Sequence, residues 1–197
     1  MSTGLIDCQE GTAVRKWTRE EYYQLAELGF FDDQRVELID GVIEVMSPRF
    51  DLHAAGVTLA YDALRAVFGA GYWVRCQATL NLSAHSQPDP DISVVVGSPR
   101  GVGHGVQSTA VLVVEVSDTT LRRDRGLKAG LYAAAGIADY WIVNLVQRQL
   151  EIRRNPQPDS TQPFGYGYAD LTTVLPGSTA SPLAAPHAAV AVDDLLP

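Results

Sequence analysis

The chain has 197 residues, of which 46% are hydrophobic and 19% are charged. This composition is typical of a folded globular protein and excludes a disordered chain. No run of about 18 uncharged apolar residues is present, which excludes a transmembrane helix, and the first residues lack the apolar segment of a secretory signal. The two cysteines, Cys8 and Cys76, lie far apart, so neither a disulfide scaffold nor a cysteine-ligated zinc site is expected. We expect one cytoplasmic domain over residues 17–197, preceded by a loose tail at residues 1–16.

The charge balance limits the kind of nucleic-acid contact that this chain can make. Fifteen basic and 23 acidic residues give a net charge of -8. A protein that coats nucleic acid needs basic surface to displace counterions from the phosphates. Any such contact must therefore come from a local patch. Only Lys16 and Lys128 are lysines and the other basic residues are arginines, which suggests that arginine does not serve at the retained lysine positions.

Two local sequence patterns predict the secondary structure of the N-terminal region. Thr18 and Glu21 have the spacing of a capping box, which predicts a helix over residues 18–29. Two short apolar runs flank the dipeptide Asp40-Gly41, and this pattern is the strongest short-range signal for a β-hairpin. We assign Asp40 to the turn of that hairpin.

The rest of the chain alternates between helical and strand patterns. The order of helix, hairpin, helix, three strands, helix and strands predicts an α/β fold with a mixed β-sheet. In chain order after the hairpin, the patterns predict a helix over 51–68, strands over 73–82 and 91–96, a glycine-rich loop over 97–105, a strand over 110–116, a helix over 121–135, a hairpin of 140–145 with 150–154, and a proline-rich remainder with edge strands around 166–174.

Two carboxylates occupy positions where strands are expected. Glu115 lies inside the unbroken apolar run 110–116, which indicates burial on both faces of a sheet, unless the residue lies at a strand end and faces solvent. A buried ionised carboxylate is costly unless it is paired or binds a cation. Asp91 follows Pro90 at the start of a β-branched run, although this dipeptide alone also suits an ordinary turn. At the ends of neighbouring strands the two carboxylates could converge on a hard divalent ion such as Mg²⁺.

Lys128 lies on the helix expected after Glu115. Asp124, Lys128 and Tyr132 have the spacing of one helix face. An ammonium group directed at two carboxylates and a metal would position a water nucleophile or stabilise charge that develops on a phosphate. The alternative is a surface ion pair between Lys128 and Asp124.

As a set, four blocks of sequence over residues 17–154 resemble the Uma-type family of restriction endonucleases, formerly a domain of unknown function, within the PD-(D/E)xK nuclease superfamily. The resemblance implies a restriction-endonuclease-like mixed β-sheet flanked by helices, with an N-terminal helix and a β-hairpin. The blocks are Arg35–Gly41 with Met46–Pro48 and His53; Pro90–Val95; Leu112–Ser117; and Lys128 with Tyr132 followed by Ala138–Val143.

The resemblance also implies roles for particular residues. Asp91 and Glu115 would match the family's metal ligands, with Mg²⁺ or Mn²⁺ as the cofactor, and Glu37 would match an additional acid that helps to hold the metal or its water. In the superfamily the lysine usually stands two residues beyond the second acid, where this chain has Ser117. In the Uma-type family the lysine is taken to have moved to the following helix, which fits Lys128.

Several further residues could contact the substrate or could have simpler structural roles. His53 is expected at the surface or as a helix cap, and Tyr140 and Trp141 in the core or at a subunit interface. The arginines beside Lys128 are suited to phosphates, although a solvated helix face also explains them. The candidates for substrate binding are Gln77, Arg122, Arg123 and Arg125.

The leading hypothesis from the sequence is a Mg²⁺-dependent DNA endonuclease that hydrolyses phosphodiester bonds. A catalytically silent binding or assembly protein on a nuclease scaffold is one alternative, favoured by the acidic balance and the missing in-strand lysine. A metal-dependent hydrolase of a small phosphorylated substrate is another. DNA bound in a local groove and a second copy of the chain are the expected partners, because duplex cutters need two sites and symmetric dimers are the commonest soluble assembly. No membrane partner is expected.

Overall fold

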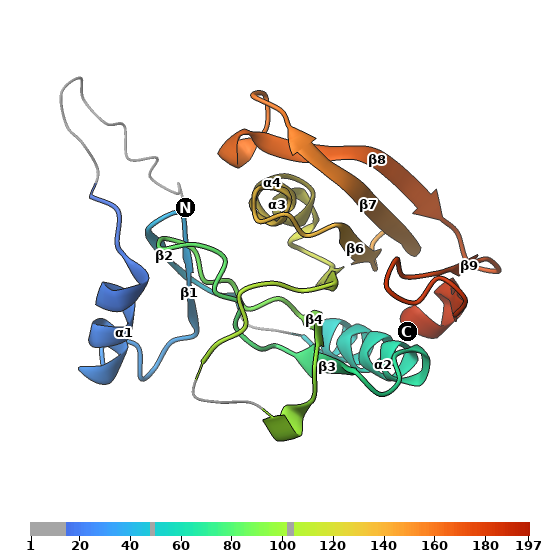
Figure 1. Cartoon of the computed structure of the whole chain (residues 1–197), viewed down its shortest axis with the longest axis horizontal. Coiled ribbons are helices and arrows are strands. Elements are labelled where there is room, and N and C mark those ends of the chain that lie inside the picture. The colour runs from blue at the N-terminus through green and yellow to red at the C-terminus, as the bar shows by residue number, and fades with distance from the viewer. Residues whose placement is uncertain (1–14, 48–49, 102–104) are drawn as a thin grey trace.

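The computed structural model describes residues 15–47, 50–101 and 105–197. Most of the expected tail, including Cys8, lies outside the described residues, as do Pro48 of the first motif block and residues 102–104 of the glycine-rich loop. A six-stranded mixed sheet forms the centre of the fold (Figure 1), with the strand order β3-β4-β5-β6-β7-β8. Strands β5 and β6 are parallel, and the other neighbouring pairs are antiparallel. The α/β fold with a mixed sheet is therefore confirmed.

The elements follow the predicted order along the chain. The strands are β1 (Val36–Ile39), β2 (Val42–Val45), β3 (Tyr72–Cys76), β4 (Ile92–Val96), β5 (Leu112–Ser117), β6 (Asp139–Asn144), β7 (Gln149–Pro158), β8 (Tyr166–Val174), β9 (Thr179–Ala180) and β10 (Val190–Ala191). The helices are α1 (Arg19–Glu27), α2 (Asp51–Val67), α3 (Leu121–Arg123), a π-helical turn (Asp124–Lys128) and α4 (Ala129–Ala134), together with short 3-10 turns at Pro99–Gly101, Pro163–Gly165 and Val192–Leu195.

The N-terminal capping box and hairpin form as the sequence predicts. The Thr18 hydroxyl accepts a hydrogen bond from the Glu21 amide at 3.2 Å, and the Glu21 carboxylate accepts one from the Thr18 amide at 3.0 Å. Strands β1 and β2 pair around Asp40 and Gly41, whose φ angles of 50° and 76° suit a tight hairpin turn. A β-bridge between Leu38 and Gln87 and a hydrogen bond from the Gly41 amide to the carbonyl oxygen of His85 join this hairpin to the segment before β4. Strand β1 of this hairpin carries Glu37.

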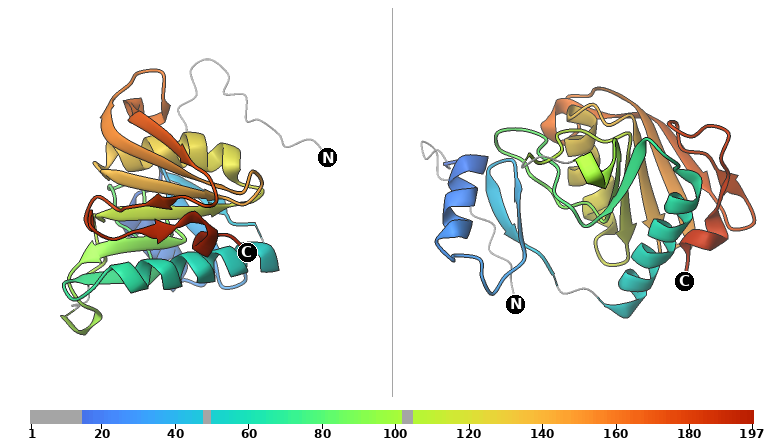
Figure 2. Two further views of the ribbon diagram at one scale, coloured as in Figure 1. Left: turned by 90° about the vertical axis from the view of Figure 1, so that its right-hand side faces the viewer. Right: turned by 60° about the horizontal axis from the view of Figure 1, so that its bottom comes forward.

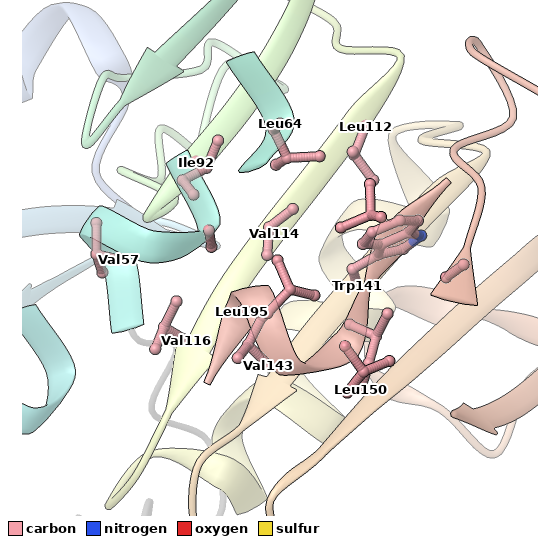
Figure 3. Packing of buried hydrophobic residues seen from close by; sticks show 14 of the residues in the cluster. Val57, Leu64, Ile92, Leu112, Val114, Val116, Trp141, Val143, Leu150 and Leu195 are labelled. Carbon is pink, nitrogen blue, oxygen red and sulfur yellow. The ribbon is translucent and has the colours of Figure 1, made fainter. Parts of the chain in front are cut away.

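Strand β5 divides its side chains between two layers. Leu112, Val114 and Val116 pack against α2 in the larger apolar cluster (Figure 3). Val113 packs on the other face, in the cluster that includes residues of α4. Because side chains alternate along a strand, Glu115 also lies on this second face. All six residues of β5 are buried and Glu115 is only 6% exposed, so the alternative of a solvent-facing glutamate is wrong.

The proline-rich C-terminal region completes the larger apolar cluster. Val190, Val192 and Leu195 are almost fully buried there beside residues of α2. In Figures 1 and 2 the C-terminal segment lies beside α2. A region whose sequence predicts mainly loops therefore contributes to the core. Tyr140 and Trp141 are fully buried, which confirms their expected packing in the core.

One predicted strand is shorter than expected. The pattern over 73–82 predicts a continuous strand, but β3 ends at Cys76. Gln77 has a φ of 48°, in the left-handed region, and this conformation breaks the ladder. The hairpin of β6 and β7 and the edge strand β8 are confirmed. Within the described ranges, none of the helices has the length and apolar character needed to cross a membrane.

Candidate active site

A cavity of about 640 Å³ collects side chains from five parts of the chain. Its walls come from the β1–β2 hairpin, the start of α2, the segment before β4, strand β5, and the helical segment that runs from α3 through the π-helical turn. The lining includes the four predicted catalytic residues Glu37, Asp91, Glu115 and Lys128. All four are less than 7% exposed. The fold thus brings together residues that are far apart in the sequence.

Asp91 and Glu115 are held side by side by each other's backbone. The Asp91 amide donates a hydrogen bond to Oε2 of Glu115 at 3.2 Å. In return, the amide of Val116 donates to Oδ2 of Asp91 at 3.0 Å. This reciprocal arrangement follows from the antiparallel pairing of β4 with β5, which brings the start of one strand to the end of the other. Two carboxylates are therefore fixed at one end of the sheet.

Lys128 directs its amine at this pair. Its Nζ donates to Oε2 of Glu37 at 2.8 Å and lies 3.5 Å from Oε1 of Glu115. The Lys128 side chain is only 5% exposed, so the alternative of a surface ion pair with Asp124 is wrong. Oδ2 of Asp124 instead accepts hydrogen bonds from the hydroxyls of Ser117 and Thr120, each at 2.6 Å.

The π-helical turn explains why the expected helix face is broken. A π-helical turn contains more residues than an α-helical turn and is frequent at functional sites. The π-helical turn covers Asp124–Lys128. The side chains of Asp124 and Lys128 therefore do not share one face, as they would at this spacing in an α-helix. Lys128 and Tyr132 keep a common direction, and the Tyr132 hydroxyl donates to Oε1 of Glu115 at 2.6 Å.

Both carboxylate oxygens of Glu37 accept hydrogen bonds from cationic side chains. Its Oε1 accepts a hydrogen bond from Arg123 at 2.6 Å, and its Oε2 accepts from Lys128 at 2.8 Å and from the Asp89 amide at 3.3 Å. Arg123 also pairs with Glu44. In the structure Glu37 thus holds the two cations in place, and the additional role beside the metal or its water that the resemblance implies stays a prediction.

The cavity shifts the pKa values of its charged groups in opposite directions. Burial raises the pKa of Glu115 to about 8, against the attraction of Lys128 and with added repulsion from Asp91. Burial alone would raise the pKa of Glu37 as well, but Lys128 and Arg123 bring it below its ordinary value. The pKa of Lys128 is raised because the attraction of the two glutamates outweighs its burial. The attraction of Lys128 thus offsets only part of the effect of burial on the pKa of Glu115.

The donor set fits a hard divalent ion. Asp91 and Glu115 supply only carboxylate oxygens, the ligands that Mg²⁺ and Mn²⁺ prefer. Across the described residues, no group of three or more His, Cys, Asp and Glu side chains is arranged to hold an ion by itself. Two carboxylates suffice for Mg²⁺, which usually keeps several waters and takes its remaining ligands from a phosphate.

The predicted substrate-binding residues separate into two groups. Arg122 and Arg123 line the cavity. Arg125 does not; it pairs with Glu151 at 2.6 Å and hydrogen-bonds to Gln147. Gln77 is also absent from the described lining, and its backbone amide donates to the carbonyl oxygen of Asp91. The structure thus supports only the first two of the four as cavity residues.

His53 is the main lining residue whose position the sequence reasoning missed. Its Nε2 lies 3.2 Å from Oδ1 of Asp91, and its side chain is 13% exposed. The expectation of a surface or capping histidine is wrong, because the first turn of α2 directs this side chain into the cavity. The place of His53 in the first motif block was the one available signal. Asp89, Asp124 and Thr120 also line the cavity without having been expected there.

The chain is an α/β protein with a six-stranded mixed sheet and a cavity lined by buried carboxylates. A solved structure titled as a putative nuclease belonging to DUF820 from Anabaena variabilis superposes with a TM-score of 0.67 at 14% identity, over 90% of this chain and 96% of that one. The family model Uma2, described as putative restriction endonuclease, matches residues 19–185, and the chain belongs to this family. No curated protein matches the sequence.

Proposed function

We propose that this protein is a divalent-metal-dependent DNA endonuclease that hydrolyses phosphodiester bonds in the cavity. The observation that carries the proposal is the convergence of two buried carboxylates, Asp91 and Glu115, with the buried amine of Lys128. Membership of the Uma2 family supports nuclease function in general. The metal dependence and the roles of the residues are proposals that follow from the family resemblance and are supported by this geometry.

Each residue would perform a distinct task. Asp91 and Glu115 would hold Mg²⁺ or Mn²⁺ through their carboxylate oxygens. When bound, the ion would neutralise charge on the scissile phosphate and lower the pKa of a water. Lys128 would orient the attacking water or stabilise charge that develops on the phosphate, because its amine lies beside Glu115. Glu37 would keep that amine in position, and Arg122 and Arg123 would contact phosphates at the mouth.

Circular DNA provides the test, because only internal cleavage opens a circle. The protein is incubated with supercoiled duplex and with circular single-stranded DNA, in Mg²⁺ or Mn²⁺ and in a chelator. We expect cleavage that requires the metal and falls by at least about 100-fold in Asp91→Asn, since a ligand is lost. Asp170→Asn, an exposed aspartate on β8, is the matched control and should cleave normally. Cleavage in chelator, or equal cleavage by Asp91→Asn, would contradict the proposal.

A second candidate is a metal-dependent hydrolase of a small phosphorylated substrate. It is favoured by the cavity volume, which lies in the range of small-ligand pockets, and by the net charge of -8. Competing nucleotides and oligonucleotides at equal phosphate concentration separate the two functions. Preferential hydrolysis of the nucleotides would favour this candidate. A silent assembly protein would instead show no calorimetric heat with divalent metal in either the natural chain or Glu115→Gln.

A further inference from the structure

The exposed part of the cavity lining has an apolar side. Val45, at the end of β2, and Phe50, immediately before α2, are each 65% exposed and line the cavity together with Met46. The carboxylates beneath are almost fully buried. A phosphate drawn to the carboxylate pair by a metal would therefore lie close to an exposed aromatic ring. Exposed aromatic rings beside phosphate sites are the surfaces on which unpaired bases stack.

Few cations are available around the cavity for a long phosphate backbone. The described lining contains six carboxylates and three cationic side chains, Arg122, Arg123 and Lys128. Lys128 is buried between glutamates, and Arg123 is paired with Glu37 and Glu44. Arg122 is the exposed cation of this set. Duplex DNA carries about one negative charge per 1.7 Å, so an intact duplex laid over the mouth would bring many phosphates to an acidic surface.

We propose that the site takes its scissile phosphate from an unpaired DNA strand and that Phe50 stacks on a base of that strand. This inference rests on the proposed function and names its substrate class. In an intact duplex the bases are already stacked and paired inside, so none can reach Phe50 unless it leaves the helix. A single strand presents both a free base and a low density of phosphates. Phe50 is then a residue that determines specificity.

Fluorescence anisotropy with labelled DNA tests the inference. A 12-nucleotide strand and the same sequence as a duplex are titrated with the full chain in Ca²⁺, an ion that takes oxygen ligands. We expect the single strand to bind at least tenfold more tightly. Phe50→Ala should weaken that binding at least about fivefold, since stacking on one ring stabilises each base by about 1 kcal/mol or more. Phe30→Ala is the matched control, because Phe30 is 64% exposed and lies outside the described lining.

The salt dependence gives an independent readout. If only Arg122 and Arg123 contact phosphates, the logarithm of the association constant should fall with the logarithm of salt concentration with a slope of about -1.4 for the single strand. A slope several times steeper would overturn the inference, because it would reveal an extended basic track.

Three other results would also overturn the inference: equal affinity for duplex and single strand, equal effects of Phe50→Ala and Phe30→Ala, or no binding of either DNA. Failure of the nuclease proposal is distinguished from these, because it appears as intact circular DNA in the cleavage experiment. Cleavage of duplex circles without any effect of Phe50→Ala would leave the nuclease and remove only the preference for an unpaired strand.

Discussion

The two faces of β5 are both buried, but they are stabilised in different ways. On one face Leu112, Val114 and Val116 are buried among apolar side chains, where burial itself is favourable. On the other face Glu115 is equally buried but depends on particular partners, chiefly Lys128 and Tyr132. Burial of charges costs solvation free energy that pairing restores only when the geometry is good. The apolar face is thus stabilised by burial alone, whereas the charged face depends on the geometry of particular partners.

The largest effect is expected from removing the buried amine. Lys128→Met keeps the length of the side chain but leaves Glu37 and Glu115 without their shared cation. Breaking a buried pair in this way costs about 3–5 kcal/mol of unfolding free energy, and DNA cleavage should also be lost. Urea unfolding and the circular-DNA assay measure the two effects. A variant of natural stability would contradict the structural role of the amine.

Arg125→Met is the matched control for that experiment. Arg125 also pairs with a glutamate, Glu151, but its side chain is 38% exposed. Glu151 is 10% exposed, but it also accepts hydrogen bonds from Asn144 and Gln149, so this variant should lose less stability than Lys128→Met. It should also cleave DNA normally, because Arg125 does not line the cavity in the described structure.

The apolar face is tested by Leu112→Ala. Leu112 is fully buried, and its truncation should lower the unfolding free energy by about 2–5 kcal/mol through lost burial and a residual cavity. The cleavage rate per folded molecule, measured well below the melting temperature, should be unchanged. Loss of cleavage in a fully folded Leu112→Ala sample would show that the two faces are not independent.

The charged face should also make stability depend on pH. The native pKa of Glu115 is about 8, whereas its ordinary value is 4.5. Between these pH values the unfolded chain releases a proton that the native chain retains. The contribution of Glu115 to the free energy of unfolding is therefore full below about pH 4.5 and is lost as pH rises to about 8. Without divalent metal, Glu115→Gln should lack this decline, so its unfolding free energy should rise relative to that of the natural chain as pH increases from about 4.5 to about 8. Parallel pH profiles in urea unfolding would contradict the assignment.

Local patterns predicted most of the secondary structure. The capping box at Thr18, the turn at Asp40-Gly41 and the apolar run around Glu115 each depend on neighbouring residues, and all three are confirmed. The strand over 73–82 was overestimated because a left-handed residue such as Gln77 carries no clear signal in sequence. The burial of the C-terminal region also escaped prediction, since short segments with prolines show no periodicity.

The site was less predictable than the fold. The resemblance assigned Asp91, Glu115 and Lys128, and the structure places them together, although their roles in catalysis remain predictions. The partners of Glu37 and the position of His53 depend on packing between β1, α2 and the helix after β5. The homodimer and the metal also remain predictions.

The sequence alone determined where most of the helices and strands form, and it favoured the burial of one carboxylate. Such properties depend on residues within a few positions of one another, whose spacing sets backbone conformation and the buried face. Only the tertiary structure decided which charges meet, because those distances depend on strand register and helix packing across the whole chain. The π-helical turn is a clear case, since one altered turn leaves Lys128 facing the glutamates and Asp124 facing Ser117.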